Sequence, residues 1–128
     1  MAYFDCPDCA STWSLRIVTS ITLPPDSRSD DILLQIVLCG NCSFRGAAIY
    51  EESRRGNPDS ESWDHRGYRL GDQELANLER LIAGCSTKED KGCQCSTHRA
   101  LSQKNEYGRW QPPFATDWKS SFPMRRSR

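Results

Sequence analysis

The chain has 128 residues and carries 17 basic and 17 acidic side chains, so its formal net charge is zero. Only 37% of its residues are hydrophobic, and its mean hydropathy is -0.71. No apolar run approaches the roughly 18 residues of a membrane helix. This composition argues against membrane insertion and predicts a small core that needs further stabilisation, for which the seven cysteines are candidates.

The amino-terminal residues, MAYFDCPDC, lack the basic and apolar regions of a secretory signal, and we therefore expect a cytoplasmic protein with no membrane association. Disulfides are disfavoured in that compartment, and an odd number of cysteines fits them poorly. Cys-x-x-Cys pairs in such a protein indicate metal or redox chemistry.

The charges are unevenly distributed along the chain. Residues 1–98 carry 10 basic against 15 acidic side chains, a net charge of -5. Residues 99–128 carry 7 against 2, a net charge of +5. The sequence therefore predicts an acidic body and a basic tail.

Three β-strands are predicted in the first half of the chain. Residues 13–23 alternate between apolar and polar side chains, which is typical of a half-buried strand. A segment rich in Pro, Asp and Ser follows at residues 24–31, and a second apolar run extends over Ile32–Leu38. A third candidate strand is Phe44–Tyr50. Three strands are about the minimum for a sheet with its own stability.

Two Cys-x-x-Cys pairs flank the predicted hairpin. Cys6 and Cys9 precede it, and Cys39 and Cys42 follow it. Two residues between the cysteines of a pair let both thiolates reach one ion, and zinc takes four such ligands tetrahedrally. Because an antiparallel hairpin brings its two ends together, we expect the four sulfurs to meet at its base and to bind one zinc ion.

This arrangement resembles the zinc ribbon superfamily over Tyr3–Tyr50, through the two Cys-x-x-Cys pairs around a hairpin. The resemblance implies that the four cysteines are structural zinc ligands. It implies no particular function, because zinc ribbons bind DNA, RNA and proteins alike. A redox pair is an alternative, but such a pair is expected to open a helix, whereas here both pairs border strands. Inert thiols and iron-binding thiols are two further interpretations of the same four cysteines.

The second half of the chain is predicted to contain one clear helix. Residues 53–62 have the composition of a loop, and the aromatic and charged segment 63–70 favours no secondary structure. An apolar stripe over Asp72–Ala83 predicts an amphipathic helix that ends at Gly84. A short helical turn is expected at residues 99–101.

The remaining cysteines form a second candidate zinc site. Cys85, Cys93, Cys95 and His98 supply three sulfurs and one imidazole within fourteen residues, which is one tetrahedral set. All seven cysteines are then used, and two zinc ions per chain are expected. The alternative is a loop of free thiols beside a solvated histidine.

Neither zinc site is predicted to be catalytic. A catalytic zinc keeps one position open for water, and four protein ligands leave none. The second site would be open only if His98 were not a ligand, with Glu89 or Asp90 as the nearby base. His65 lies in an aromatic and charged segment, either on a functional surface or simply facing water. We therefore predict that the protein is not an enzyme.

The carboxy-terminal arm mixes aromatic and basic residues with prolines. Its aromatic residues are candidate anchors that become ordered on a protein partner or on the chain's own body. Its cations and aromatic rings would also suit nucleic acid, although the acidic body opposes this alternative. A plain solvated extension is the third possibility. The candidate partner-binding residues are Trp110, Phe114, Trp118, Phe122, Arg125 and Arg126.

Together these patterns predict a small α+β zinc protein. It would contain a three-stranded antiparallel zinc ribbon (residues 1–56), a helix with a second zinc-binding loop (57–103) and an extended aromatic and basic arm (104–128). The expected function is that of a non-catalytic scaffold or adaptor that docks to a protein partner in a larger complex. Nucleic-acid binding through the arm is the alternative.

Overall fold

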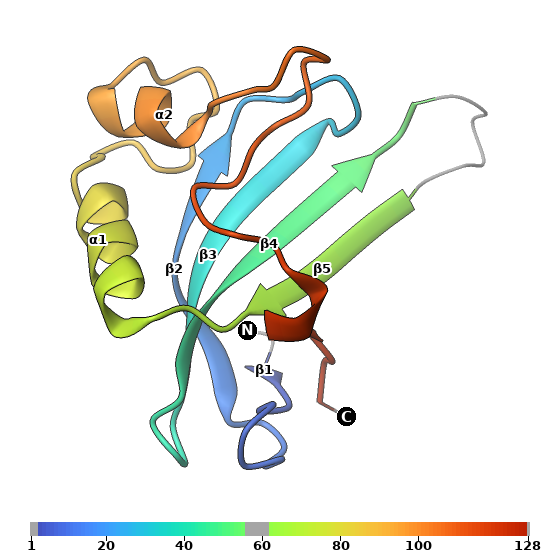
Figure 1. Cartoon of the computed structure of the whole chain (residues 1–128), viewed down its shortest axis with the longest axis vertical. Helices are drawn as coiled ribbons and strands as arrows, with labels where there is room; N and C mark the ends of the chain where they lie inside the picture. Colours follow the sequence, from blue (N-terminus) through green and yellow to red (C-terminus); the bar gives the residue numbers. More distant parts are fainter. Residues whose placement is uncertain (1–2, 56–61, 128) are drawn as a thin grey trace.

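The computed structural model describes residues 3–55 and 62–127. Its main element is a six-stranded antiparallel sheet in which each strand pairs with the next along the chain (Figure 1). The strands are β1 (Tyr3–Phe4), β2 (Leu15–Leu23), β3 (Asp31–Cys39), β4 (Arg45–Ser53), β5 (Ser62–Tyr68) and β6 (Ser121–Pro123). The helical elements are α1 (Asp72–Ala83), α2 (Ser96–Leu101) and a 3-10 turn, Trp118–Ser120.

The predicted fold of a three-stranded ribbon followed by a helix is wrong. The three expected strands are present as β2, β3 and β4, but the sheet continues into β5 and β6, and the chain is mostly β. Periodicity does not mark β5, because its residues show no regular alternation of apolar and polar side chains. Its pairing with β4, from Ala47↔Tyr68 to Ser53↔Ser62, places it in the sheet.

The segments near the two chain termini close one edge region of the curled sheet. Strand β6 pairs with β5, and the ring of Phe122 lies so close to Gly67 that any side chain at this glycine would collide with it. Beyond β6 the chain turns to β1, where the Asp5 amide donates to the Arg125 carbonyl at 2.9 Å and the Ser127 amide donates to the Tyr3 carbonyl at 2.9 Å. The sheet is therefore bent into a half-barrel that the terminal segments hold together.

Each face of the sheet has its own apolar cluster. Helix α1 covers the first face with Leu75, Leu78 and Ile82, and the arm crosses the same face to place Trp110 against it (Figure 1). The second face forms the inside of the half-barrel. Its buried residues are Phe4, Cys6, Leu15, Val37, Cys39, Ala48, Phe122 and Met124.

One predicted domain boundary and part of one predicted loop fall on residues that the structure does not describe. The boundary expected between residues 56 and 57, and residues 56–61 of the expected loop, lie outside the described residues. Among residues 3–55 and 62–127, neither helix is long and apolar enough to cross a membrane.

Candidate metal centres

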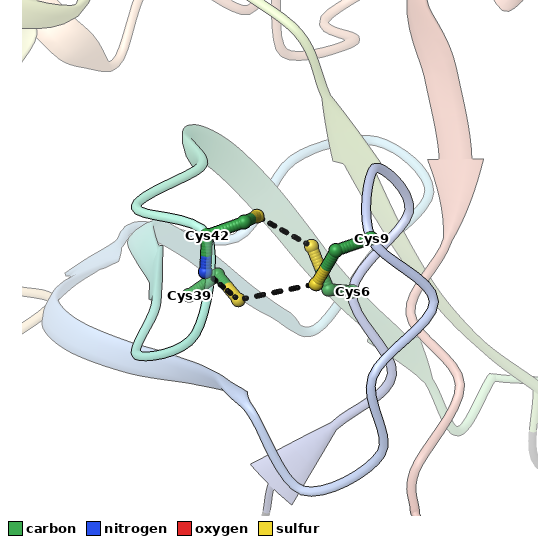
Figure 2. A group of neighbouring side chains, drawn as sticks. All are labelled: Cys6, Cys9, Cys39 and Cys42. Atoms are coloured by element: carbon green, nitrogen blue, oxygen red, sulfur yellow. Dashed lines mark hydrogen bonds between the residues drawn. The ribbon is translucent and has the colours of Figure 1, made fainter.

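The first metal centre lies where the hairpin of β2 and β3 meets the turn that leads from β1. Cys6 and Cys9 come from that turn, Cys39 is the last residue of β3, and Cys42 belongs to the turn into β4. Figure 2 shows the two pairs facing each other, with the sulfur atoms directed into the space between them. The structure thus brings together the four cysteines that the spacing singles out.

The distances between these sulfurs suit a shared metal ion. The Sγ atoms of Cys6 and Cys42 are 3.6 Å apart, those of Cys9 and Cys39 are 3.8 Å apart, and all four lie within 4.8 Å of one another. A disulfide would need about 2.05 Å. Four sulfurs arranged tetrahedrally at about 2.3 Å from a zinc ion would be separated by about 3.8 Å. The group is therefore compatible with a zinc site and has no disulfide geometry.

Backbone amides of the two turns are directed at the sulfurs. Asp8 N–H donates to Cys6 Sγ at 3.4 Å, and the N–H groups of Asn41 and Cys42 donate to Cys39 Sγ at 3.3 and 3.4 Å. Such bonds favour the thiolate form and fix the sulfur positions, which is the role of the outer shell of a metal site. The same contacts would orient thiolate ligands of a bound metal ion.

The thiols of this centre differ in pKa because their hydrogen-bond partners, burial and neighbouring sulfurs differ. The Asn41 side-chain amide, with help from Ser11, lowers the pKa of Cys9 to about 6. The pKa of Cys42 is raised to about 12: the Phe44 amide favours its thiolate, but desolvation and the neighbouring sulfurs outweigh that contact. Without a cation the four groups cannot all ionise, whereas a bound metal ion would stabilise four thiolates together.

The second metal centre joins α1 to α2. Cys85 follows the end of α1, and Cys95 is the residue that caps the start of α2. Cys85 Sγ lies 3.9 Å from Cys93 Sγ, and His98 Nδ1 lies 3.3 Å from Cys85 Sγ and 3.4 Å from Cys95 Sγ. The four ligand atoms lie within 4.8 Å of one another. These spacings fit three sulfurs and one nitrogen around a single ion.

The orientation of His98 fits a metal ligand. The ring is almost completely buried, and its Nε2 lies 2.9 Å from the Thr22 carbonyl oxygen. Because a carbonyl can only accept, Nε2 carries the proton and Nδ1 directs its lone pair towards the sulfurs. The alternative of a solvated histidine beside free thiols does not agree with this burial. The Thr22 amide also donates to the Lys88 carbonyl at 2.7 Å, so the metal loop covers the free edge of β2.

Both centres are complete sets of four ligands. Within the described residues, no carboxylate belongs to either group. Glu89 and Asp90, the bases considered for an open second site, are exposed, and Asp90 accepts from the Gly92 amide at 2.9 Å. A tetrahedral ion bound by all four groups of the second centre would have no open position.

The aromatic and basic residues of the arm do not form one surface. Trp110 and Phe122 are buried in the chain's own body, and Phe114 is half-buried against Tyr68 with the ring centroids 5.6 Å apart. The exposed members of the predicted set are Trp118, Arg125 and Arg126. Trp118 is 79% exposed.

An ion cluster that sequence patterns do not reveal holds the arm on the body. The carboxylate of Asp26 is completely buried and accepts from the amides of Ser29 and Trp110 at 2.7 Å each. Arg109 pairs with Asp26 and with Glu51, to which it donates at 3.0 Å. A Pro-Pro-Asp-Ser segment is a turn signal, but nothing local to it points to a partner 83 residues away.

This cluster predicts a measurable loss of stability in Asp26→Asn. Burial opposes ionisation, but the amide hydrogen bonds and Arg109 outweigh it and lower the pKa of Asp26 from 3.8 to about 2. The carboxylate therefore stabilises the fold by about 2 kcal/mol above the unfolded pKa, and this contribution disappears as the pH falls from about 4 through about 2. Urea unfolding at pH 7 should show that loss in Asp26→Asn and a change below about 0.5 kcal/mol in the exposed control Asp72→Asn.

Acidification would also protonate thiolate ligands. The pH test therefore compares the free energies of unfolding of the wild type and of Asp26→Asn at each pH. The stability difference between wild type and Asp26→Asn should shrink as the pH falls through the window of about 4 to about 2. A difference that stays constant across that window would contradict the ionic role of Asp26.

No protein-family model, curated protein or solved structure matches this chain.

Proposed function

We propose that the chain is a non-catalytic protein that binds two structural zinc ions and docks to a protein partner in a larger complex. The observation that supports this most directly is the closed four-ligand geometry of both centres, with sulfur as the dominant donor. Soft thiolate ligands in tetrahedral sets favour zinc over harder divalent ions. The pair of Cys-x-x-Cys turns at the base of a hairpin is the local arrangement found in zinc ribbons.

The position of each centre supports a structural role. The first centre joins the turn after β1 to the end of β3, and the second joins α1, α2 and the edge of β2. Each would link segments that are distant in sequence. A site of this kind can contribute on the order of 10 kcal/mol to folding.

A protein partner is supported by an exposed aromatic residue on a fixed backbone. Trp118 is solvent-exposed, yet the Asp117 side chain accepts from the Lys119 amide at 3.0 Å and the Ser121 hydroxyl donates to the Trp118 carbonyl at 2.7 Å. An aromatic side chain on an ordered segment loses little entropy on binding, and Trp is prominent among residues that dominate interfaces. We therefore place the docking surface around Trp118.

The test is affinity purification of the full chain in parallel with two variants. Trp118→Ala should lose the specific partner, whereas Tyr107→Ala, which removes another exposed aromatic side chain of the arm, should retain it. The partner should survive nuclease treatment and a rise in salt from about 50 to about 200 mM, over which phosphate binding would weaken steeply. Recovery of nucleic acid that is lost at the higher salt would favour the alternative. Equal recovery by both variants would contradict docking at Trp118.

A further inference from the structure

A cavity of about 740 Å³ lies on the inner face of the half-barrel, on the side of the sheet opposite α1. Figure 1 shows β2 to β5 fanning out away from the end where the two chain termini lie. The terminal segments close that end. Phe4, Met124 and Ile17 of the neighbouring strand β2 line the cavity. Pockets that hold small organic ligands have volumes of this size, and the open ends of β-barrels are common places for them.

The walls of this cavity are mainly aromatic. The rings of Phe4 and Tyr50 contact the His65 ring edge to face, with centroid distances of 5.2 and 5.5 Å. Trp63 also lines the cavity and is 67% exposed, although it belongs to a strand. A large exposed aromatic side chain next to an apolar cavity indicates a surface that a ligand can cover.

The polar groups of the cavity restrict the charge of a ligand. His65 Nε2 lies 2.7 Å from the Gln35 side-chain carbonyl oxygen, and because that oxygen can only accept, the ring is a proton donor there. Burial lowers the pKa of His65 to about 4, so the ring is neutral at physiological pH. Within the part of the chain that the structure describes, Arg126 is then the one charged residue that lines the cavity, and no acidic residue lines it.

Arg126 is placed to meet an anion. Its backbone is fixed by the bridge to Phe4. It lines the cavity together with His65, and its positive charge helps to lower the pKa of that ring. Among residues 3–55 and 62–127, no carboxylate forms an ion pair with Arg126. Its neighbour Arg125 is also exposed but does not line the cavity.

We propose that this cavity binds a small organic monocarboxylate with an apolar, preferably aromatic body. The body packs between Phe4, Tyr50 and Trp63, and the carboxylate pairs with Arg126. The aromatic walls supply the burial, and the guanidinium supplies a charge-assisted pair that distinguishes an acid from its neutral analogue. This proposal does not depend on docking at Trp118.

The test uses 2-naphthoate and its neutral analogue 2-naphthamide with the full zinc-loaded chain. Isothermal titration should show that the acid binds roughly tenfold more tightly than the amide. Arg126→Gln should abolish that preference, whereas the matched control Arg125→Gln should retain it. Amide chemical shifts in NMR spectra should change at Phe4 and His65.

The following results would each overturn the proposal. They are equal affinities of the two probes for the wild-type chain, equal losses in the two arginine variants, and the absence of binding at the solubility limit of the acid. Shift changes confined to α1 would likewise place the probe elsewhere. The zinc content of both arginine variants is measured as a control for folding. If it is unchanged, a loss of binding is not the result of a folding defect.

Discussion

Replacement of Cys39 by serine is expected to have the largest effect of any single substitution. The variant should bind one zinc ion instead of two and should no longer be stably folded at 37 °C. Cys39 is buried at the end of β3, lies 3.8 Å from Cys9 Sγ and accepts two backbone amides, so the serine variant replaces a thiolate ligand by a hydroxyl that binds zinc poorly. The lost metal contribution is on the order of 10 kcal/mol, comparable to the net stability of roughly 5 to 15 kcal/mol for a typical domain.

Metal analysis after gel filtration, combined with circular dichroism, measures both effects. Ser43→Gly is the matched control, because it changes the same turn without removing a ligand. Ser43 has φ of 67°, a left-handed conformation that glycine adopts readily. A Cys39→Ser protein that keeps two zinc ions and wild-type unfolding would show that this sulfur is not a structural ligand.

Replacement of His98 by alanine should have the second largest effect. The variant should lose the second zinc ion and be destabilised on the order of 5 kcal/mol, since three thiolates remain but the buried imidazole is gone. The Thr22 carbonyl loses its donor from Nε2, and the loop around Lys88 that covers the edge of β2 loses its anchor. Zinc content and urea unfolding provide the measurement.

The chain has two histidines, which supplies a direct control for this variant. His65→Ala breaks the contact with Gln35 and the ring contacts with Phe4 and Tyr50, at a cost of about 1 to 3 kcal/mol. It should nevertheless keep two zinc ions. The same zinc content in both alanine variants would remove His98 from the second centre.

The grouping of the candidate metal ligands could be predicted because it depends on local spacing. Cys6 and Cys9 occupy one turn, Cys39 and Cys42 another, and the alternation of residues 13–23 predicts the hairpin that brings the turns together. The helix Asp72–Ala83 could be predicted in the same way, since its apolar stripe repeats over three turns. Each of these sequence patterns lies within one hairpin or helix and the residues at its two ends.

The rest of the sheet depends on partners that are distant in sequence. Strand β6 has three residues and includes a proline, so it has no strand pattern of its own; it exists because Phe122 fits against Gly67 of β5. Strand β1 has two residues and is completed by the segment around Arg126. The placement of the arm likewise follows from the buried Asp26 carboxylate, which no local pattern connects to Arg109. Periodicity cannot detect contacts of this type.

We propose that two metal centres hold this fold together, and metal removal from the wild-type chain tests this proposal most directly. The purified protein should contain two zinc ions per chain and give a dispersed amide NMR spectrum. Exhaustive chelation under reducing conditions should release both ions and collapse the dispersion, and added zinc should restore it. A metal-free chain that keeps its dispersed spectrum while all seven cysteines react with a thiol reagent would contradict the account.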